Sequence, residues 1–314
     1  MNRFVLVSLL LCVSCGQHGA SPPSTPPYDP SRFNGTNALS EVRGFLAVGP
    51  RVAGTAGAQQ AADYLQERLN ALGVIVERQS FKDVTPSGSN TFVNIIATLP
   101  GKKPGLILLG AHYDTKSGIE SFDGANDSGS GVGMLLALAP ILRDGAGQAP
   151  TLQLVFLDGE ECQVDYGPHD GLQGSRYLAA QLSRTGRSRE VLAFILFDMI
   201  GDKELSVTVP RNGTPELISR VFDAATEMGV RSKFSLFQGT VLDDHQPFLD
   251  HGMPAIDLID FEYGSAPGLN DYWHTSADTL DKLSANSLET VGHVVLRALN
   301  GLVHSTSGSF KAAN

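Results

Sequence analysis

Acidic and imidazole side chains recur immediately after short apolar runs of this chain. His112 and Asp114 follow one run, Asp127 comes a little later, and Glu160 and Glu161 follow the next run. Carboxylates and imidazoles are the ligands of catalytic zinc sites that keep one coordination position open. Further side chains of these two types stand in comparable places, at Asp158, Asp198, Asp243, Asp244, His245 and His274.

The apolar runs have the length and composition of strands buried on both faces of a sheet. Stretches with helical periodicity lie between them and predict covering helices. This alternation predicts a single α/β domain, a three-layer α/β/α sandwich around a mostly parallel sheet. The carboxyl ends of parallel strands meet in one crevice, so the polar residues above can lie close together. The predicted strands are 74–80, 92–99, 106–111, 152–157, 192–197 and 255–259, and the predicted helices are 58–72, 131–142, 174–183, 215–228 and 284–303.

Each candidate residue also has a simpler interpretation. His112 and Asp114 could form a hydrogen-bonded pair at a strand end, and Asp127 could cap the helix that follows it. The adjacent glutamates could form a solvated acidic patch, and His274 could be a hydrogen-bonded core histidine. However, carboxylates gathered with no lysine or arginine among them repel one another unless a cation or shared protons intervene. Their joint placement therefore favours a divalent metal site.

Composition limits the function classes but selects none. The 314 residues are 42% hydrophobic, which is enough for a large core and excludes a wholly disordered chain. The net charge of −10 argues against nucleic-acid binding, which needs basic surface. Three cysteines do not form a disulfide framework. The buried-strand pattern thus indicates a globular protein of enzyme size.

The N-terminus predicts export. Residues 1–15 combine a positive start with an apolar stretch too short to span a bilayer, which is typical of a signal peptide. Its end resembles a lipoprotein signal with Cys15 as the lipidated residue, and plain secretion is the alternative. We expect a proline-rich linker at residues 16–38, the folded domain at 39–305 and a tail at 306–314. These features predict a periplasmic or outer-surface protein. The lipoprotein-type signal predicts that a lipid anchors it to a bacterial membrane.

Eight short motifs, taken together, make the chain resemble the zinc-dependent aminopeptidase family over nearly all of residues 40–303. Within that family it resembles most the glutaminyl cyclases of animals and bacteria. The motifs are FVNIIA at 92–97, GAHYD at 110–114, GAND at 124–127, FLDGEE at 156–161, GSR at 174–176, FDMIG at 197–201, DHQPF at 244–248 and WHT at 273–275.

Three features favour the cyclases over the peptidases. Residues 162–174 have the length and the P-x-D-x-L-x-G pattern of cyclases, Asp243 stands where peptidases commonly have a small residue, and Trp273 precedes the ligand histidine. There are also departures from the animal enzymes. Tyr166 replaces a tryptophan, Asp257 replaces a histidine, and Cys162 has no disulfide partner near the site.

The resemblance implies a glutaminyl-peptide cyclotransferase that converts the N-terminal glutamine of peptides or proteins to pyroglutamate and releases ammonia. It implies one zinc ion per chain and a monomer. Glu160 would transfer the proton. The remaining roles implied are zinc ligands at Asp127, Glu161 and His274, a carboxyl chain at Asp198 and Asp243, and pocket walls at Trp273 and Tyr166.

The aminopeptidase alternative uses the same residues differently. His112 and Asp198 would join a second zinc, Asp127 would bridge both metals, and Glu160 would activate a water. We expect one zinc because a hydrogen bond between Asp198 and Asp243 would make Asp198 less available as a ligand. A non-enzymatic binding protein is a third possibility, but such a protein would have little use for the paired glutamates.

Overall fold

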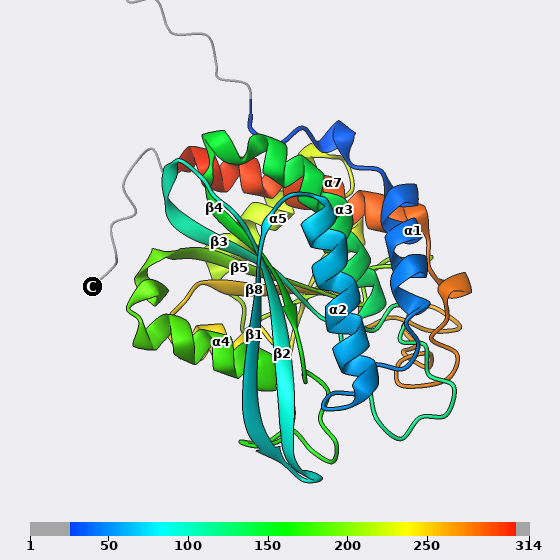
Figure 1. Cartoon of the computed structure of the whole chain (residues 1–314). Helices are drawn as coiled ribbons and strands as arrows, with labels where there is room; N and C mark the ends of the chain where they lie inside the picture. The colour runs from blue at the N-terminus through cyan, green and yellow to red at the C-terminus, as the bar shows by residue number, and fades with distance from the viewer. Residues whose placement is uncertain (1–25, 306–314) are drawn as a thin grey trace, which may run out of the picture.

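A six-stranded sheet runs through the centre of the computed structural model, which describes residues 26–305 (Figure 1). The strand order is β1–β2–β4–β3–β5–β8. β3 is parallel to β4 and β5, and β5 is parallel to β8, whereas β1 and β2 form an antiparallel hairpin beside β4. The strands are β1 (Ile75–Thr85), β2 (Gly88–Leu99), β3 (Lys103–His112), β4 (Pro150–Leu157), β5 (Val191–Asp198) and β8 (Ala255–Ile259).

Helices cover both faces of this sheet, which confirms the predicted three-layer architecture. Five helices pack on one face and two on the other. The first group is α1 (Gly35–Leu46), α2 (Ala56–Ala71), α3 (Gly129–Gly145), α5 (Pro215–Glu227) and α7 (Ala285–Ser305), and the second is α4 (Gln173–Arg184) and α6 (Gln246–Asp250).

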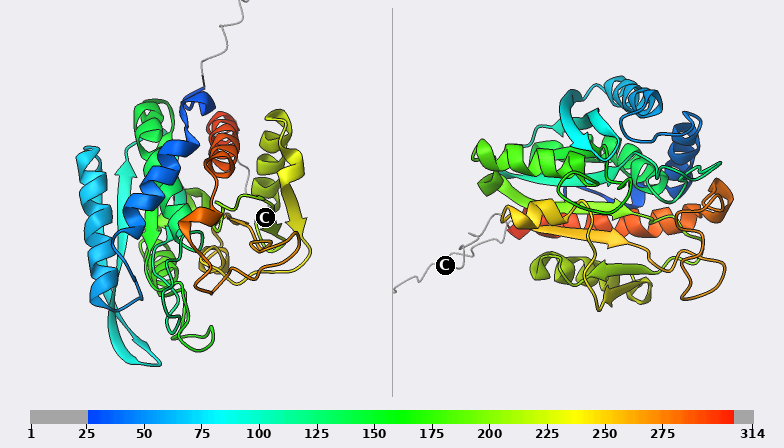
Figure 2. Two further views of the ribbon diagram at one scale, coloured as in Figure 1. Left: turned by 90° about the vertical axis from the view of Figure 1, so that its right-hand side faces the viewer. Right: turned by 90° about the horizontal axis from the view of Figure 1, so that it is seen from below.

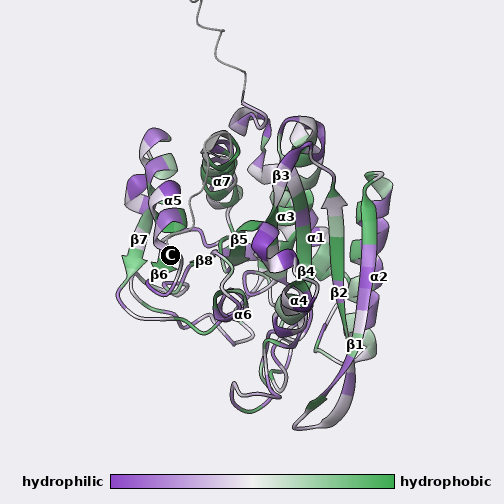
Figure 3. Ribbon diagram, turned by 90° about the vertical axis from the view of Figure 1, so that its left-hand side faces the viewer, coloured by the Kyte–Doolittle hydropathy of each residue, from purple (hydrophilic) through white to green (hydrophobic). Residues whose placement is uncertain are grey.

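Successive residues of the central strands point to opposite helical layers, as the two-residue period of a strand requires. In β3, Ile107 and Leu109 belong to the core on the α3 side, whereas Leu106 and Leu108 belong to the core on the α4 side. Both faces are therefore dry, which explains why the strands are apolar throughout instead of alternating. Figure 3 shows hydrophobic residues concentrated along the strands between the helical layers.

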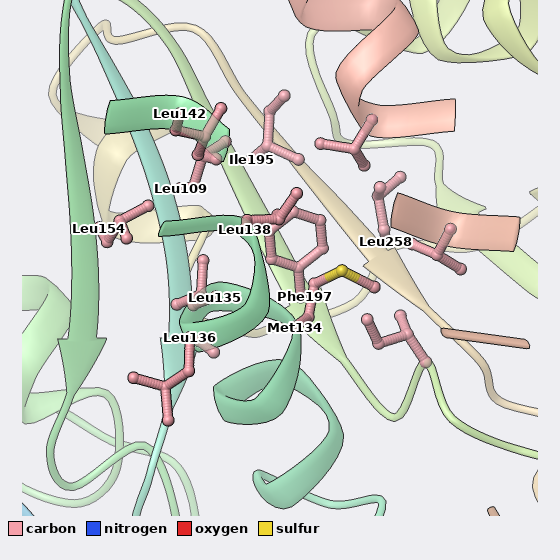
Figure 4. Close-up of a cluster of buried hydrophobic side chains, with 14 of the residues drawn as sticks. Leu109, Met134, Leu135, Leu136, Leu138, Leu142, Leu154, Ile195, Phe197 and Leu258 are labelled. Atoms are coloured by element: carbon pink, nitrogen blue, oxygen red, sulfur yellow. The ribbon is translucent and has the colours of Figure 1, made fainter. Parts of the chain in front are cut away.

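α3 is the helix that begins at the site, and it is buried around most of its circumference. Met134 and Leu138 face Phe197 and its neighbours on the sheet (Figure 4). A helix that is hydrophobic on all sides is a core helix. Gly131 permits its close approach to the sheet, because a Cβ there would lie 2.5 Å from the carbonyl oxygen of Phe197. The packing of α3 thus fixes the position of the loop that precedes it.

The folded part begins before the expected boundary at residue 39. α1 starts at Gly35, and Tyr28 and Phe33 are buried ahead of it. The main chain of Tyr28 exchanges two hydrogen bonds with the side chain of Asn300 in α7, of 3.1 and 2.6 Å. Residues 26–38 of the predicted linker therefore belong to the domain, because their aromatic side chains find apolar partners. The predicted signal at 1–15 and the tail at 306–314 lie outside the described residues.

A small parallel pair of strands lies beside β8 and was not predicted. β6 (Val207–Pro210) and β7 (Phe234–Phe237) pair with each other, and α5 connects them next to α7 (Figure 2). Across residues 26–305, no helix combines the length and hydrophobicity that crossing a bilayer requires. The 3-10 helices are η1 (Pro30–Arg32), η2 (Ala146–Gln148), η3 (Arg187–Glu190), η4 (Arg231–Lys233) and η5 (Leu280–Lys282).

Candidate active site

The predicted site residues meet at the carboxyl edge of the parallel strands. β3 ends at His112, β5 ends at Asp198, and Glu160 follows the end of β4. Asp243 precedes α6, and His274 lies between β8 and α7. The chain therefore brings together at one edge residues separated by up to half its length.

Asp127, Glu161 and His274 place their polar atoms around one point. The Nε2 atom of His274 lies 3.3 Å from Asp127 Oδ2 and 3.0 Å from Glu161 Oε1. A tetrahedral zinc ion with bonds of about 2.0–2.2 Å separates its ligand atoms by roughly 3.3–3.5 Å. Asp127 Oδ2 and Glu161 Oε2 are buried and accept no hydrogen bond from the described residues. The three side chains therefore fit a zinc ion in both spacing and chemistry.

A second group of possible ligands shares Asp127 with the first. His112 Nε2 lies 3.2 Å from Asp127 Oδ1 and 3.4 Å from Asp198 Oδ1. The ligand atoms of these three residues also lie close enough together to hold a metal ion. The geometry thus accommodates the two-metal alternative as well as the one-metal interpretation.

Glu160 and Tyr166 are joined by a hydrogen bond. The hydroxyl of Tyr166 donates to Glu160 Oε1 at 2.8 Å. Burial raises the pKa of Glu160 well above its usual range, and the charge of Glu161 raises it further. Tyr166 was predicted only as a pocket wall, and its contact with the predicted proton-transfer group was not anticipated.

The carboxyl chain is arranged differently from the prediction. The hydrogen bonds of the described residues join Asp198 to His112, at 3.4 Å, and none of them joins Asp198 to Asp243. Asp243 instead has a carboxyl oxygen within 4.8 Å of a carboxyl oxygen of the buried Asp257. Burial raises the pKa of Asp243 well above its usual range, and the charges of Asp198 and Asp244 raise it further. Acids this close share protons rather than all ionise.

Two histidines supply positive charge to these acids. Burial alone would lower the pKa of His112, but close contacts with the carboxylates of Asp114, Asp127 and Asp198 raise it well above 6.5. Burial also lowers the pKa of His274, but the contacts of its ring with Asp127 and Glu161 outweigh burial and raise that pKa to about 9.

A pocket of about 340 Å³ opens onto the acids. Asp127, Glu160 and Asp198 form its deep end, and aromatic side chains form its outer wall. Trp273 stacks on His274 with ring centroids 4.1 Å apart and is 37% exposed at the pocket mouth. The predicted pocket-wall tryptophan therefore both lines the opening and holds the ring of a predicted ligand.

Four further residues support the site and were not assigned this role from the sequence. The carboxylate of Asp114 accepts the main-chain N–H groups of Glu160 and Glu161 at 3.1 and 3.2 Å. Lys116 Nζ lies 3.5 Å from Glu161 Oε2. The expectation that no lysine or arginine stands among the acids is therefore wrong. The complete set of these supporting residues is Arg51, Asp114, Lys116 and Asp278.

Comparison with known proteins identifies the family. The profile of peptidase family M28 matches residues 94–299. The chain belongs to peptidase family M28. A glutaminyl-peptide cyclotransferase of Drosophila melanogaster is 30% identical over 285 residues, which are 82% of this chain and 78% of that protein.

Two solved structures show that the similarity extends to the fold. The structure of an Acidobacteriales bacterium glutaminyl cyclase has a TM-score of 0.84 and 35% identity, and the match covers 91% of this chain and 99% of the other. A Zn-dependent exopeptidase from Parabacteroides distasonis has a TM-score of 0.76 and 27% identity, with 85% and 98% covered. These findings confirm the resemblance to glutaminyl cyclases of the zinc-exopeptidase type, while the roles of single residues stay predictions.

Proposed function

We propose that this M28 protein is a zinc-dependent glutaminyl-peptide cyclotransferase. It closes the N-terminal glutamine of a peptide or protein to pyroglutamate and releases ammonia. The observation that carries this proposal is that one pocket is lined both by the acids Glu160, Asp198 and Asp243 and by the candidate zinc ligands. Those ligands are Asp127, Glu161 and His274. The similarity to a curated cyclotransferase and to a bacterial glutaminyl cyclase supports the same reaction.

Asp127, Glu161 and His274 would hold the zinc ion. When bound there, zinc supplies a Lewis acid that polarises the γ-carbonyl of the substrate glutamine. The three side chains provide two negative charges and one neutral imidazole once His274 has lost its proton. Trp273 keeps that imidazole in place by stacking on it. Asp114 fixes the main chain at Glu161.

Glu160 would move the proton. The α-amine of the substrate attacks its own γ-carbonyl carbon, so the new N–C bond closes a ring and the bond to the amide nitrogen breaks. Glu160 takes the proton that the amine loses and delivers it to the departing ammonia. Its raised pKa suits this exchange, because a less acidic carboxyl accepts the proton of the amine more readily than an ordinary glutamate does. No external nucleophile is required.

The rest of the pocket would orient the substrate and limit hydrolysis. Phe261 and Trp273 meet edge to face at 6.1 Å and form an apolar wall above the acids. Water competes with the α-amine as a nucleophile, so an apolar wall favours ring closure. Asp198 and Asp243 would accept hydrogen bonds from the α-amine and hold it near Glu160.

A two-metal aminopeptidase is the second candidate, and the His112, Asp127 and Asp198 group favours it. We propose one zinc ion because Asp127, Glu161 and His274 all line the pocket that would take the substrate. His112 also does not line the pocket, whereas His274 does.

One experiment separates these candidates. The purified chain is given a glutaminyl peptide, the same peptide with an acetylated amine, and a leucyl amide, and zinc is measured in the same sample. We expect ammonia from the first substrate only, and about one zinc ion per chain. Two zinc ions together with faster release of leucine would refute the cyclase proposal. The acetylated peptide is the matched control because its nitrogen cannot attack.

We also propose that the protein is exported and held at a bacterial membrane through Cys15. Support comes from the sequence alone, in the apolar stretch that precedes Cys15 and the proline-rich segment that follows it. Its substrates would then be peptides and proteins outside the cytoplasm.

A further inference from the structure

Arg51 is a completely buried arginine whose guanidinium contacts the main chain beside the metal-binding group. It lies between α1 and α2 and is 0% exposed. Its Nε donates to the carbonyl of Tyr113 at 3.0 Å, and its Nη2 donates to the carbonyls of Asp123 and Gly124 at 3.0 and 3.2 Å. Nη2 also donates to Ser128 Oγ at 3.1 Å. These acceptors are uncharged, so the bonds hold the loops without neutralising the guanidinium.

The loop that Arg51 holds carries Asp127 between two residues of left-handed conformation. Gly124 has φ +58° and Ser128 has φ +78°. Such a φ is strained for serine and persists only where surrounding contacts enforce it. Ser128 stands at the N-terminus of α3, yet its side chain makes no capping bond there and contacts Arg51 instead. A Cβ at Gly124 would lie 3.0 Å from Arg51 Nη2, which shows how closely the loop and the guanidinium approach.

The opposite side of the same loop is held by a carboxylate. Asp278 accepts the N–H groups of Asn126 and Asp127 at 2.8 and 3.1 Å, and the hydroxyl of Tyr263 at 2.7 Å. A cation thus binds the loop's carbonyls and an anion binds its amides. Asp127 lies between them with its two oxygens directed at two different histidines.

The positive charge of the Arg51 guanidinium also favours this arrangement of the loop. Burial lowers the pKa of Arg51 to about 10, and the charges of Asp114, Asp278 and Asp127 oppose that lowering. The guanidinium is therefore protonated at neutral pH. Burying a charge without an ion-paired partner costs free energy. The hydrogen bonds of Arg51 to the loops, and the charges of the nearby carboxylates, offset this cost.

We infer that Arg51 is a positioning residue of the zinc centre, which fixes the Asp127 loop in its strained conformation and stabilises the Asp127 carboxylate as a ligand. The inference rests on the ligand set proposed above. Arg51 contacts neither the substrate nor the metal, and its effect passes through the 123–128 main chain. Groups that orient metal ligands typically change metal affinity by about 10–100-fold when they are removed.

The test compares Arg51→Lys, Arg51→Met and Ser128→Ala with wild type. Zinc affinity is measured by competition with a chelator, and melting temperature is measured with zinc and with the zinc removed. We expect zinc binding about 10–100-fold weaker in both Arg51 variants and a smaller loss in Ser128→Ala. The increase in melting temperature that zinc produces should shrink in the same order.

Arg78→Met is the matched control. Arg78 is also an arginine that joins separate elements, since it donates to Asp63 and Gln59 in α2, but it lies away from the acids. Its loss should lower the melting temperature with and without zinc equally and leave zinc affinity unchanged. Equal zinc affinity in wild type, Arg51→Lys and Ser128→Ala would overturn the inference even if Arg51→Met fails to fold. Absence of zinc binding in wild type would instead overturn the proposed function together with this inference.

Discussion

Glu160 and Glu161 are neighbours in sequence, yet their surroundings assign them different chemistry. Glu161 contacts His274 and Lys116, so positive partners face its carboxylate. Burial raises the pKa of Glu161 to about 7, and the contact with His274 opposes the rise. The Glu160 carboxyl accepts a hydrogen bond from Tyr166, and within residues 26–305 its one ion-pair contact is with His112, at 4.0 Å. Two side chains of the same type thus suit different roles, Glu161 as a metal ligand and Glu160 as a proton carrier.

Glu160→Gln tests the proton-transfer role. Glutamine has nearly the same shape but cannot exchange a proton, so turnover should fall by about 10²–10⁴ while zinc content stays at the wild-type level. Steady-state kinetics and metal analysis on one preparation provide the measurement. A variant that keeps more than about a tenth of the wild-type rate would show that another group carries the proton.

Tyr166→Phe tests the hydrogen bond to that group. Removing the hydroxyl leaves Glu160 Oε1 without its 2.8 Å donor and the aromatic wall intact. A hydrogen bond to a charged group is worth about 1.5–3 kcal/mol, and we expect kcat to fall about tenfold with little change in KM. An equal fall produced by Tyr166→Leu and Tyr166→Phe would agree with this role, whereas loss only in Tyr166→Leu would show that the tyrosine serves solely as a wall.

At the scale of the elements, the sequence could predict what depends on local pattern. The central strands and the residues at their carboxyl ends follow from apolar runs and from sheet geometry, and the structure places His112 and Asp198 there. β6 and β7 were missed because each has only four residues, too few for a clear period. Arg51 was missed for a different reason. Its acceptors are mostly main-chain carbonyls. Every residue has such a carbonyl, so no pattern of side-chain types in the sequence reveals them.

The loop before α6 depends on a neutral histidine, which makes its stability sensitive to acid. His245 Nε2 lies 2.9 Å from the amide nitrogen of Asn212, a donor, so Nε2 must accept. Burial lowers the pKa of His245 from 6.5 to about 4. The stabilisation from this ring is complete above pH 6.5 and is lost as the pH falls from there towards 4, because the unfolded chain takes up a proton first.

His245→Gln should reduce that acid sensitivity, since a glutamine carbonyl can accept the same bond and does not titrate. The free energy of unfolding, from urea denaturation at pH 7.5 and 5.5, should fall by about 1 kcal/mol more in wild type than in the variant. His169→Gln is the control, because the side chain of His169 is 70% exposed. Equal losses in wild type and His245→Gln would show that His245 titrates normally.

At the scale of the whole molecule, the described chain begins at the end of the sheet opposite the active site. Tyr28 is bonded to Asn300 in the last part of α7. Lys103, the first residue of β3, donates to the carbonyl of Val303 nearby, whereas the site lies beyond the last residue of β3. Figure 1 shows this start of the chain beside α7. The described chain therefore begins on the side of the sheet away from the pocket.

Cys15→Ser tests the tether. If Cys15 carries the lipid, its loss should move the protein from the membrane fraction to the soluble fraction of a cell lysate, because one or more acyl chains supply the attachment. Activity per molecule should not change, since the site lies at the opposite edge of the sheet. Cys12→Ser is the matched control, because it alters a cysteine of the same segment without removing the predicted lipidation site. A membrane-bound Cys15→Ser protein, or one released equally by both substitutions, would exclude Cys15 as the anchor and favour plain secretion or attachment by another segment.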